Sequence, residues 1–305
     1  MPEEPAPPVP EPGQVLVRND AVGVNFIDVY YRDGSYPSEL PFIPGQEAAG
    51  TVMETGEGVT GFAPGDTVAY ATHRGAYART AAVPAGKLVP VPDGVAVRDA
   101  AAVLLQGLAA HYLTHDTHPV GAGETVVVLA AAGGLGRLLV QLAAHRGATV
   151  IAVVSGAEKE KAALESGARH ALRYEGFGER VRELTGGAGA QVVYDSVGAA
   201  TFEDSLRALG RRGMLVLCGA SSGPVPPLDT GLLRSGGSLY VTRPTLGDHV
   251  PDSDALRARA AQVFALLATG AIRPLVSREL PLERAAEAHR LLEDRATIGK
   301  LLLLP

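Results

Sequence analysis

The sequence contains a single cysteine, Cys218, among its 305 residues. One cysteine excludes an intramolecular disulfide and any zinc site built from several thiolates. No apolar run approaches the roughly 18 residues that a membrane-spanning helix needs. The N-terminal segment MPEEPAPPVPEPG has neither a basic start nor an apolar centre, so we expect no signal peptide. These absences predict a soluble, cytoplasmic protein with no membrane partner.

The chain also lacks an excess of positive charge. It carries 27 Lys and Arg against 33 Asp and Glu, which gives a formal net charge of −6. Such a balance provides no broad basic surface, so we expect no nucleic-acid partner. Hydrophobic residues make up 46% of the chain, which is enough for a large core. The length suits two domains of roughly 150 residues each.

The most informative segment is residues 124–147, which read ETVVVLAAAGGLGRLLVQLAAHRG. An apolar run, then small residues, then a second apolar run predict a strand, a tight turn and a helix. Ala131, Gly133 and Gly136 occupy the three positions of a dinucleotide-binding fingerprint, with alanine at the first. Small residues let the backbone approach a pyrophosphate, and the N–H groups at the start of the helix face the phosphates. The segment therefore predicts a nucleotide site.

Strand and helix patterns alternate from residue 124 onward, which predicts an α/β Rossmann domain with a doubly wound, parallel, six-stranded sheet. The expected strands are Thr125–Ala130, Ala148–Val154, His170–Arg173, Gln191–Asp195, Gly213–Cys218 and Ser238–Thr242. Residues 14–91 instead show short apolar runs between turn sequences, which is typical of an irregular β domain. The first 13 residues hold six prolines, so we expect them to be disordered.

The end of the second expected strand bears on the choice of cofactor. An acidic residue there would bind a ribose 2′-hydroxyl and repel a 2′-phosphate. This strand ends in Val154 and Ser155, and Lys159 follows shortly. A hydroxyl, a small loop and a lysine suit a phosphate, which favours NADPH. The alternative, that Lys159 and Lys161 are solvent-facing helix residues, stays open.

Four motifs in colinear order resemble the quinone oxidoreductases, in the zinc-free, ζ-crystallin-like branch of the medium-chain dehydrogenase/reductase superfamily. They are GVNFIDVYYRDGSYP (23–37), AAAGGLG (130–136), YDSVG (194–198) and SLYVTRP (238–244). The resemblance implies a GroES-like, mainly β catalytic domain formed by residues 1–106 and 245–305. It also implies a Rossmann domain over residues 107–244 and NADPH in the cleft between the two.

The resemblance implies roles for individual residues. Asn25 and Tyr30 would border the nicotinamide and Tyr36 would line the quinone pocket, so these three are the catalytic candidates. Core packing of the tyrosines, and capping of the next helical turn by Asn25, are the alternatives. The expected cofactor-binding set, from fingerprint and resemblance together, is Asn25, Tyr30, Tyr112, Ala131, Gly133, Leu135, Gly136, Ser155, Lys159, Tyr174, Ser196, Gly219, Ser221, Arg243 and Arg295.

The chain departs from the family pattern at two places. Ala109 stands where relatives often carry threonine, which removes one expected nicotinamide contact. Relatives usually begin with an extra β-strand before the Pro-rich segment, and this sequence begins after it. We therefore expect the strand Gln14–Arg18 to lack a partner and to leave an exposed edge.

No metal site is expected. Zinc-dependent members of the superfamily carry Gly-His-Glu where this chain has Gly45-Gln46-Glu47, and a glutamine amide does not replace imidazole as a zinc ligand. Asp28 has no other ligand near it in sequence. His111, His115 and His118 form a loose group that we interpret as surface residues, and Cys218 as core packing. Ser221 lacks the Gly-x-Ser-x-Gly context of a nucleophile.

Without a metal or an evident general base, reduction of an electrophilic acceptor is the favoured reaction. A quinone can accept hydride from a nicotinamide that lies close and in line, and the phenols of Tyr30 and Tyr36 could donate to its developing oxyanion. The alternatives are an NADPH-dependent enone or 2-alkenal reductase and a non-enzymatic, crystallin-like or RNA-binding protein. The apolar edge strand Ser238–Thr242 predicts a homodimer joined along it.

Overall fold

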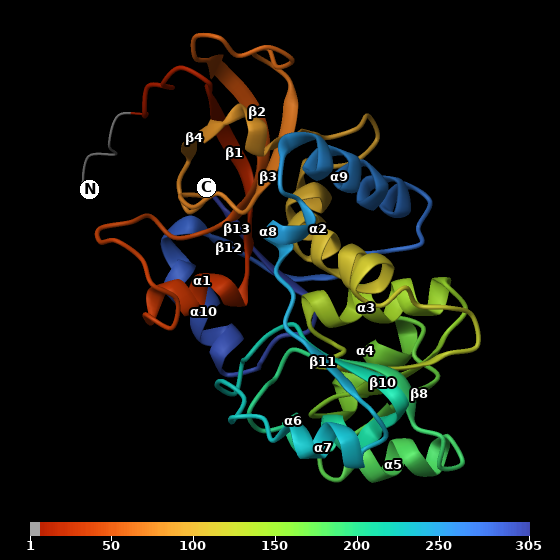
Figure 1. Cartoon of the computed structure of the whole chain (residues 1–305). Coiled ribbons are helices and arrows are strands. Elements are labelled where there is room, and N and C mark those ends of the chain that lie inside the picture. The colour runs from red at the N-terminus through yellow and green to blue at the C-terminus, as the bar shows by residue number, and fades with distance from the viewer. Residues whose placement is uncertain (1–6) are drawn as a thin grey trace. The chain divides into compact units, whose positions relative to one another are not determined.

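The computed structural model describes residues 7–305 of the protein (Figure 1). The disorder expected for residues 1–13 falls partly on residues 1–6, which lie outside the described part; residues 7–13 form no strand or helix. The chain forms two compact units. The first contains residues up to 108, 250–270 and 274–305, and the second contains residues 109–249 and 271–273.

The first unit is built on a seven-stranded, mainly antiparallel sheet. Its strands are β1 (Gln14–Val24), β2 (Glu47–Thr55), β3 (Thr67–Ala71), β4 (Thr80–Pro84), β5 (Leu88–Pro90), β12 (Val276–Pro281) and β13 (Lys300–Leu304). They follow the order β12-β13-β1-β2-β3-β5, and β4 pairs with β1. Strands from both ends of the chain thus share one sheet, and the GroES-like, mainly β prediction is confirmed.

The exposed edge expected at Gln14–Arg18 is wrong. Val15 of β1 lies opposite Thr55 of β2 on one side and Val83 of β4 on the other. Strand β1 also continues to Val24, and its last residues pair with β13. A register shift after Asn19 lets one long strand change neighbours along its length.

Helices cover this sheet. They are α1 (Phe26–Arg32), α9 (Ser253–Ala268) and α10 (Ala285–Glu293), with the first part of α2 (Val97–Tyr112) and the short 3-10 turns η1 (Ala85–Lys87) and η3 (Leu282–Arg284). Valines and leucines of β1 and β13 are fully buried in one apolar cluster, among them Val15, Val22 and Leu301. Burial of these side chains supplies the driving force that joins the two ends of the chain.

The second unit is a six-stranded parallel sheet, as predicted. Its strands are β6 (Thr125–Leu129), β7 (Thr149–Val153), β8 (His170–Leu172), β9 (Ala190–Asp195), β10 (Leu209–Leu217) and β11 (Tyr240–Thr242). The order is β11-β10-β9-β6-β7-β8, and every pair is parallel. Strand β11 lies at the edge, where the sequence placed it.

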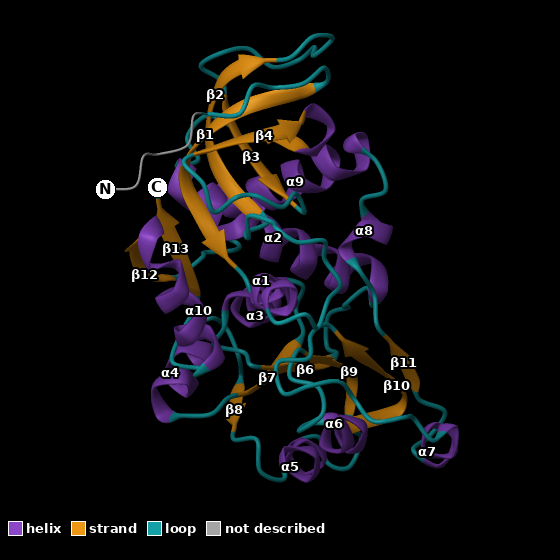
Figure 2. Cartoon of the chain, turned by 90° about the vertical axis from the view of Figure 1, so that its left-hand side faces the viewer, coloured by secondary structure: helices purple, strands orange, loops and turns teal. Residues whose placement is uncertain are grey.

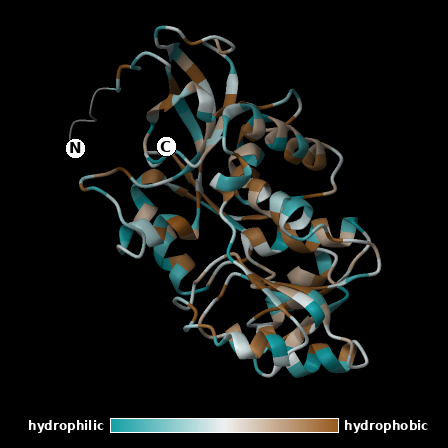
Figure 3. Ribbon diagram, in the orientation of Figure 1, coloured by the Kyte–Doolittle hydropathy of each residue, from teal (hydrophilic) through white to brown (hydrophobic). Residues whose placement is uncertain are grey.

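Helices flank both faces of this sheet. Figure 2 shows α3 (Gly134–His145) and α4 (Ala157–Glu165) on one face and α5 (Phe177–Leu184) and α6 (Phe202–Ala208) on the other. The remaining elements of the unit are the π-helical turn η2 (Leu113–Thr117), α7 (Thr230–Ser235) and α8 (Leu246–His249). Because both faces are covered, the central strands are nearly continuous apolar runs, which appear brown in Figure 3.

Candidate active site and nucleotide-binding edge

Most of the predicted cofactor residues of the second unit follow the carboxyl ends of its strands. Because the strands are parallel, these ends meet at one edge of the sheet. Ala131 follows β6, Ser155 follows β7, Tyr174 follows β8, Ser196 follows β9, Gly219 follows β10 and Arg243 follows β11. The strand order reverses between β6 and β9, so the fingerprint turn lies at the topological switch point. This is the position where open α/β sheets bind ligands.

The turn after β6 requires its small residues. A Cβ on Gly136 would lie 2.3 Å from the carbonyl oxygen of Ala130, and one on Gly133 would lie 3.3 Å from the same atom. Ala130 itself has a φ of 48°, which bends the chain sharply from the strand into α3. Helix α3 begins at Gly134 with Gly133 as its N-cap. The backbone N–H groups at this helix start can therefore receive a pyrophosphate.

The end of β7 carries the basic residues that suit a 2′-phosphate. The Lys159 ammonium donates to Ser155 Oγ at 3.3 Å, so the two predicted phosphate ligands lie together. Arg173 was not predicted, yet its Nη1 is 3.8 Å from the position of a Cβ on Gly156. Arg173 also pairs with Glu160. Tyr174 accepts a hydrogen bond from the Ala130 N–H at 3.2 Å, which ties this end to the fingerprint turn.

The loop after β9 is organised by a buried carboxylate. Asp195 is fully buried, and it accepts hydrogen bonds from the N–H groups of Val197 and Gly198 and from the hydroxyls of Thr201 and Ser205. These bonds fix the backbone of Ser196. Gly219 packs against this turn, since its Cβ would lie 2.7 Å from the Ser196 carbonyl oxygen, and Ser221 N–H donates to that oxygen.

The other predicted cofactor residues are placed as follows. Leu135 lies in the first turn of α3 and is half-buried. Tyr112 is buried and stacks on the ring of His249, with centroids 4.2 Å apart. Arg243 is exposed, and Arg295 belongs to the first unit. The cofactor-binding roles of these four side chains stay predictions.

Two interpretations need correction. His111 is not a surface residue: it is 5% exposed and stacks on His115 with centroids 3.9 Å apart. His111 lies on the buried face of helix α2, which begins at Val97. The spacing of the three histidines alone could not reveal this.

Cys218 lies just past the end of β10 rather than within it. Burial raises the pKa of its thiol to about 12, so the thiolate is scarce at neutral pH.

In the first unit, Tyr30 and Tyr36 lie together. Their ring centroids are 5.1 Å apart, and the Tyr36 N–H donates to the Tyr30 carbonyl oxygen. Phe26 packs on Tyr30 and Tyr31 on Tyr36, and the Arg74 guanidinium lies over the Tyr31 ring. Both candidate tyrosines are half-buried rather than enclosed in the core. The geometry leaves an aromatic surface that a flat ring can stack against.

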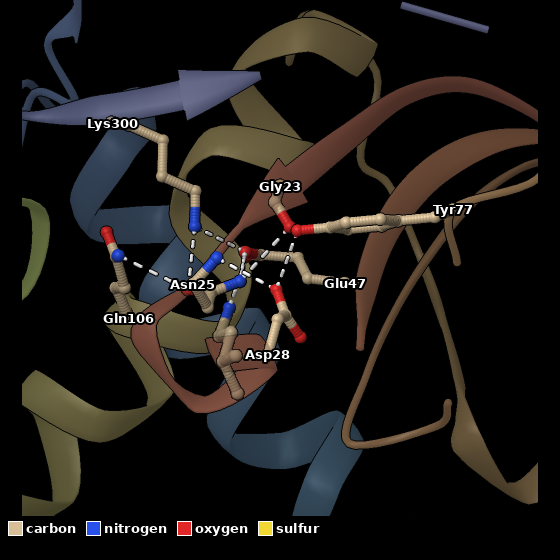
Figure 4. A network of polar contacts seen from close by, with 8 residues as sticks. Gly23, Asn25, Asp28, Glu47, Tyr77, Gln106 and Lys300 are labelled. Atoms are coloured by element: carbon tan, nitrogen blue, oxygen red, sulfur yellow. Dashed lines mark hydrogen bonds and ion pairs between the residues drawn. The ribbon is translucent and has the colours of Figure 1, made fainter. Parts of the chain in front are cut away.

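Asn25 is the centre of a buried polar network (Figure 4). Its amide oxygen accepts from Lys300 Nζ at 2.8 Å and from Gln106 Nε2 at 3.2 Å. Its amide nitrogen donates to Glu47 Oε2 at 2.8 Å and to the Gly23 carbonyl oxygen at 3.2 Å. All four hydrogen-bonding positions of the amide are therefore used. Asn25 is also the N-cap residue of α1, where it forms a capping box with Asp28.

A second branch of the network runs through Asp28. Its Oδ2 accepts from the Asn25 N–H at 2.9 Å and from the Tyr77 hydroxyl at 3.1 Å. The Tyr77 oxygen lies 3.0 Å from Nε2 of His289, whose Nδ1 faces the guanidinium of Arg32. Because arginine can only donate, Nδ1 accepts and the proton lies on Nε2. Burial is the main cause that raises the pKa of Asp28 from 3.8 to about 7.

The residues of this network do not fit a zinc ion. Position 46 offers an amide, and the Glu47 carboxylate is bonded to the Lys300 ammonium. Among residues 7–305, no three His, Cys, Asp or Glu side chains gather in a way that could hold a metal ion. The nucleotide-binding edge does fit NADPH, since its helix start, its close-packed glycines and the Ser155–Lys159 pair match the parts of that molecule.

Comparison with known proteins agrees with this geometry. Residues 11–93 match the family model of the alcohol dehydrogenase GroES-like domain, and residues 134–252 match the model described as zinc-binding dehydrogenase. Among the described residues, no helix is long and apolar enough to cross a membrane. Fold and site together define a nicotinamide-dependent reductase of the medium-chain class.

The relatives narrow the class further. The quinone oxidoreductase of Pseudomonas aeruginosa is 45% identical over 98% of this chain and 93% of its own length. The 2-haloacrylate reductase of a Burkholderia species is 41% identical over 97% of this chain and 92% of its own. The structure of Escherichia coli quinone oxidoreductase complexed with NADPH has a TM-score of 0.96 at 41% identity, covering 99% of this chain and 95% of that one. The chain belongs to the quinone oxidoreductase family.

Proposed function

We propose that the protein is a zinc-independent, NADPH-dependent quinone oxidoreductase. The observation that carries the proposal is the nucleotide-binding edge: six parallel strands end at one edge of the sheet, six of the predicted cofactor residues follow these ends, and the Gly133–Gly136 turn lies at the switch point. A relative of known structure that was solved with NADPH has the same fold at a TM-score of 0.96. Both support NADPH as the cofactor.

The residues of this chain would bind and orient the reactants. NADPH, when bound, supplies a hydride, and with one proton from solvent a quinone becomes a hydroquinone. The N–H groups at the start of α3 hold the pyrophosphate, and Lys159 and Ser155 hold the 2′-phosphate. Tyr30 and Tyr36 stack against the acceptor and donate hydrogen bonds to its oxygen as negative charge develops there.

Zinc takes no part in this proposal. The Glu47 carboxylate, which follows Gln46, already balances the charge of Lys300, and Gln46 supplies no metal-binding nitrogen. Conjugated acceptors such as enones or haloacrylates are the second candidate substrates, because one relative is named a 2-haloacrylate reductase. They need the same hydride and the same oxyanion donors.

The test is NADPH oxidation, followed by its absorbance, with a quinone, an enone, a 2-haloacrylate or no acceptor. We expect rapid oxidation with the quinone and a lower kcat/KM with NADH than with NADPH. Activity with the enone alone would select the second candidate. Inactivity with every acceptor, together with NADPH binding, would favour a non-enzymatic role.

We also propose that the protein is a cytoplasmic homodimer joined along β11. This strand is the edge of the parallel sheet, and Tyr240 on it is 49% exposed. An apolar, unpaired edge invites a second copy to continue the sheet. Light scattering gives the solution mass, and a mass equal to one chain of 31.5 kDa would contradict the proposal.

A further inference from the structure

Lys300 is a buried lysine at the start of the last strand, β13. Its residue is 2% exposed, and its ammonium donates to Glu47 Oε2 at 2.6 Å and to Asn25 Oδ1 at 2.8 Å (Figure 4). Lysine is almost never fully buried unless it is paired. Lys300 therefore belongs to the polar network, although it lies near the C-terminus and Asn25 and Glu47 lie near the N-terminus.

The ammonium balances a carboxylate that has no access to water. Glu47 is 0% exposed. Its Oε1 accepts from the Leu105 N–H at 2.6 Å, and its Oε2 accepts from both Lys300 and Asn25. Removing one partner of a buried ion pair leaves an uncompensated charge, which is strongly destabilising, whereas replacing both partners by neutral groups is often tolerated.

The same ammonium orients the Asn25 amide. Lysine has donors and no acceptor, so the amide oxygen must face Lys300 and the amide nitrogen must face Glu47. An amide turned by 180° would point N–H groups at the ammonium and an oxygen at the carboxylate. Lys300 and Glu47 together thus allow one orientation of Asn25.

We propose that Lys300 is a positioning residue of the reaction, a side-chain cation that holds Glu47 and Asn25 in place. This rests on the proposed function, in which Asn25 borders the nicotinamide. The glutamate after Gln46 is bonded to a protein cation. The network needs no metal to be electrically balanced.

The experiment compares Lys300→Met, Glu47→Gln and the double variant, with Lys87→Met as the matched control. Lys87 is an exposed lysine of the same unit. Melting temperature, the Kd of NADPH from its fluorescence, and kcat and KM for the quinone are measured for each. An NMR spectrum follows the side-chain amide signals of Asn25, assigned by their loss in Asn25→Asp.

We expect Lys300→Met to lower the melting temperature and to reduce kcat at least tenfold, with the NADPH Kd within twofold of wild type. The double variant should regain the melting temperature but not kcat, because Asn25 Oδ1 still lacks its charged donor. The Asn25 amide protons should exchange slowly in the wild type and faster in both variants that lack Lys300.

Recovery of kcat in the double variant would overturn the proposal, because charge balance alone would then suffice. So would a kcat of Lys300→Met within twofold of wild type, or unchanged Asn25 exchange. If Lys300→Met does not fold, the double variant decides. Failure of the proposed function has a separate sign, which is a wild type that oxidises no NADPH with quinone. The exchange of the Asn25 amide protons is measured without any turnover, so it reports on the Lys300 contact in either case.

Discussion

The buried carboxyl of Asp28 should make the stability of the protein depend on pH in an unusual direction. Its pKa is raised from 3.8 to about 7 in the folded protein, chiefly because burial disfavours the charged form. The unfolded chain therefore releases this proton at lower pH than the folded one. The contribution of Asp28 is fully favourable below about pH 4, is lost as the pH rises toward 7, and is constant above it.

The difference between the two pKa values corresponds to about 4 kcal/mol. Asp28→Asn keeps the oxygen that accepts from the Asn25 N–H and the Tyr77 hydroxyl, and it removes the titration. The new amide nitrogen replaces Oδ1, which has no hydrogen-bond partner among residues 7–305. That unpaired donor costs about 1–3 kcal/mol at every pH.

The assay is urea unfolding of wild type and Asp28→Asn at intervals from pH 5 to pH 8, with Asp93→Asn as an exposed control. The free energy of unfolding of wild type, relative to the variant, should fall by a few kcal/mol over this range. The control should run parallel to the wild type. Parallel curves for Asp28→Asn and wild type would refute the assignment of Asp28 as a carboxyl that is protonated near neutral pH.

Three further predictions concern single residues. Gly136→Ala should raise the Kd of NADPH at least tenfold, measured by fluorescence titration, because its Cβ would lie 2.3 Å from the Ala130 oxygen; an unchanged Kd would show that the turn can relax. Lys159→Met should raise the Kd of NADPH about 10- to 150-fold and leave the Kd of NADH nearly unchanged, since a lost charged contact to phosphate costs about 1.5–3 kcal/mol; an equal rise for both cofactors would place Lys159 elsewhere. Gln46→Met should raise the free energy of unfolding by about 1–3 kcal/mol, because Nε2 of Gln46 is buried with no partner within residues 7–305; a less stable variant in urea unfolding would contradict this.

The second unit could be predicted from its sequence because its contacts are local. Each strand of the parallel sheet is a short apolar run, and each is followed within a few residues by the turn or helix that fixes it. The Ala131–Gly136 fingerprint predicted both the turn that the structure shows at that point and a nucleotide ligand. The predicted strand boundaries are therefore close to the observed ones, although β10 begins four residues before the predicted Gly213.

The first unit could be predicted only in outline, because its decisive contacts join distant residues. No pattern in the sequence indicated that Lys300, at the start of β13, pairs with Glu47, 253 positions away. An alternation pattern does not reveal a lysine that faces inward. The exposed edge expected at Gln14–Arg18 failed for the same reason, since β4 covers it from residues 80–84. Arg173 was missed because Gly156, beside it in space, is 17 positions away.

The proposed reaction is the reduction of a quinone with NADPH and without a metal. The most direct measurement is the rate of quinone-dependent NADPH oxidation before and after exhaustive dialysis against a zinc chelator, with metal content determined in both samples. We expect the same rate in both samples and no stoichiometric metal in either, because the Glu47 carboxylate is already paired with Lys300. A rate that is lost on dialysis and restored by zinc would contradict it.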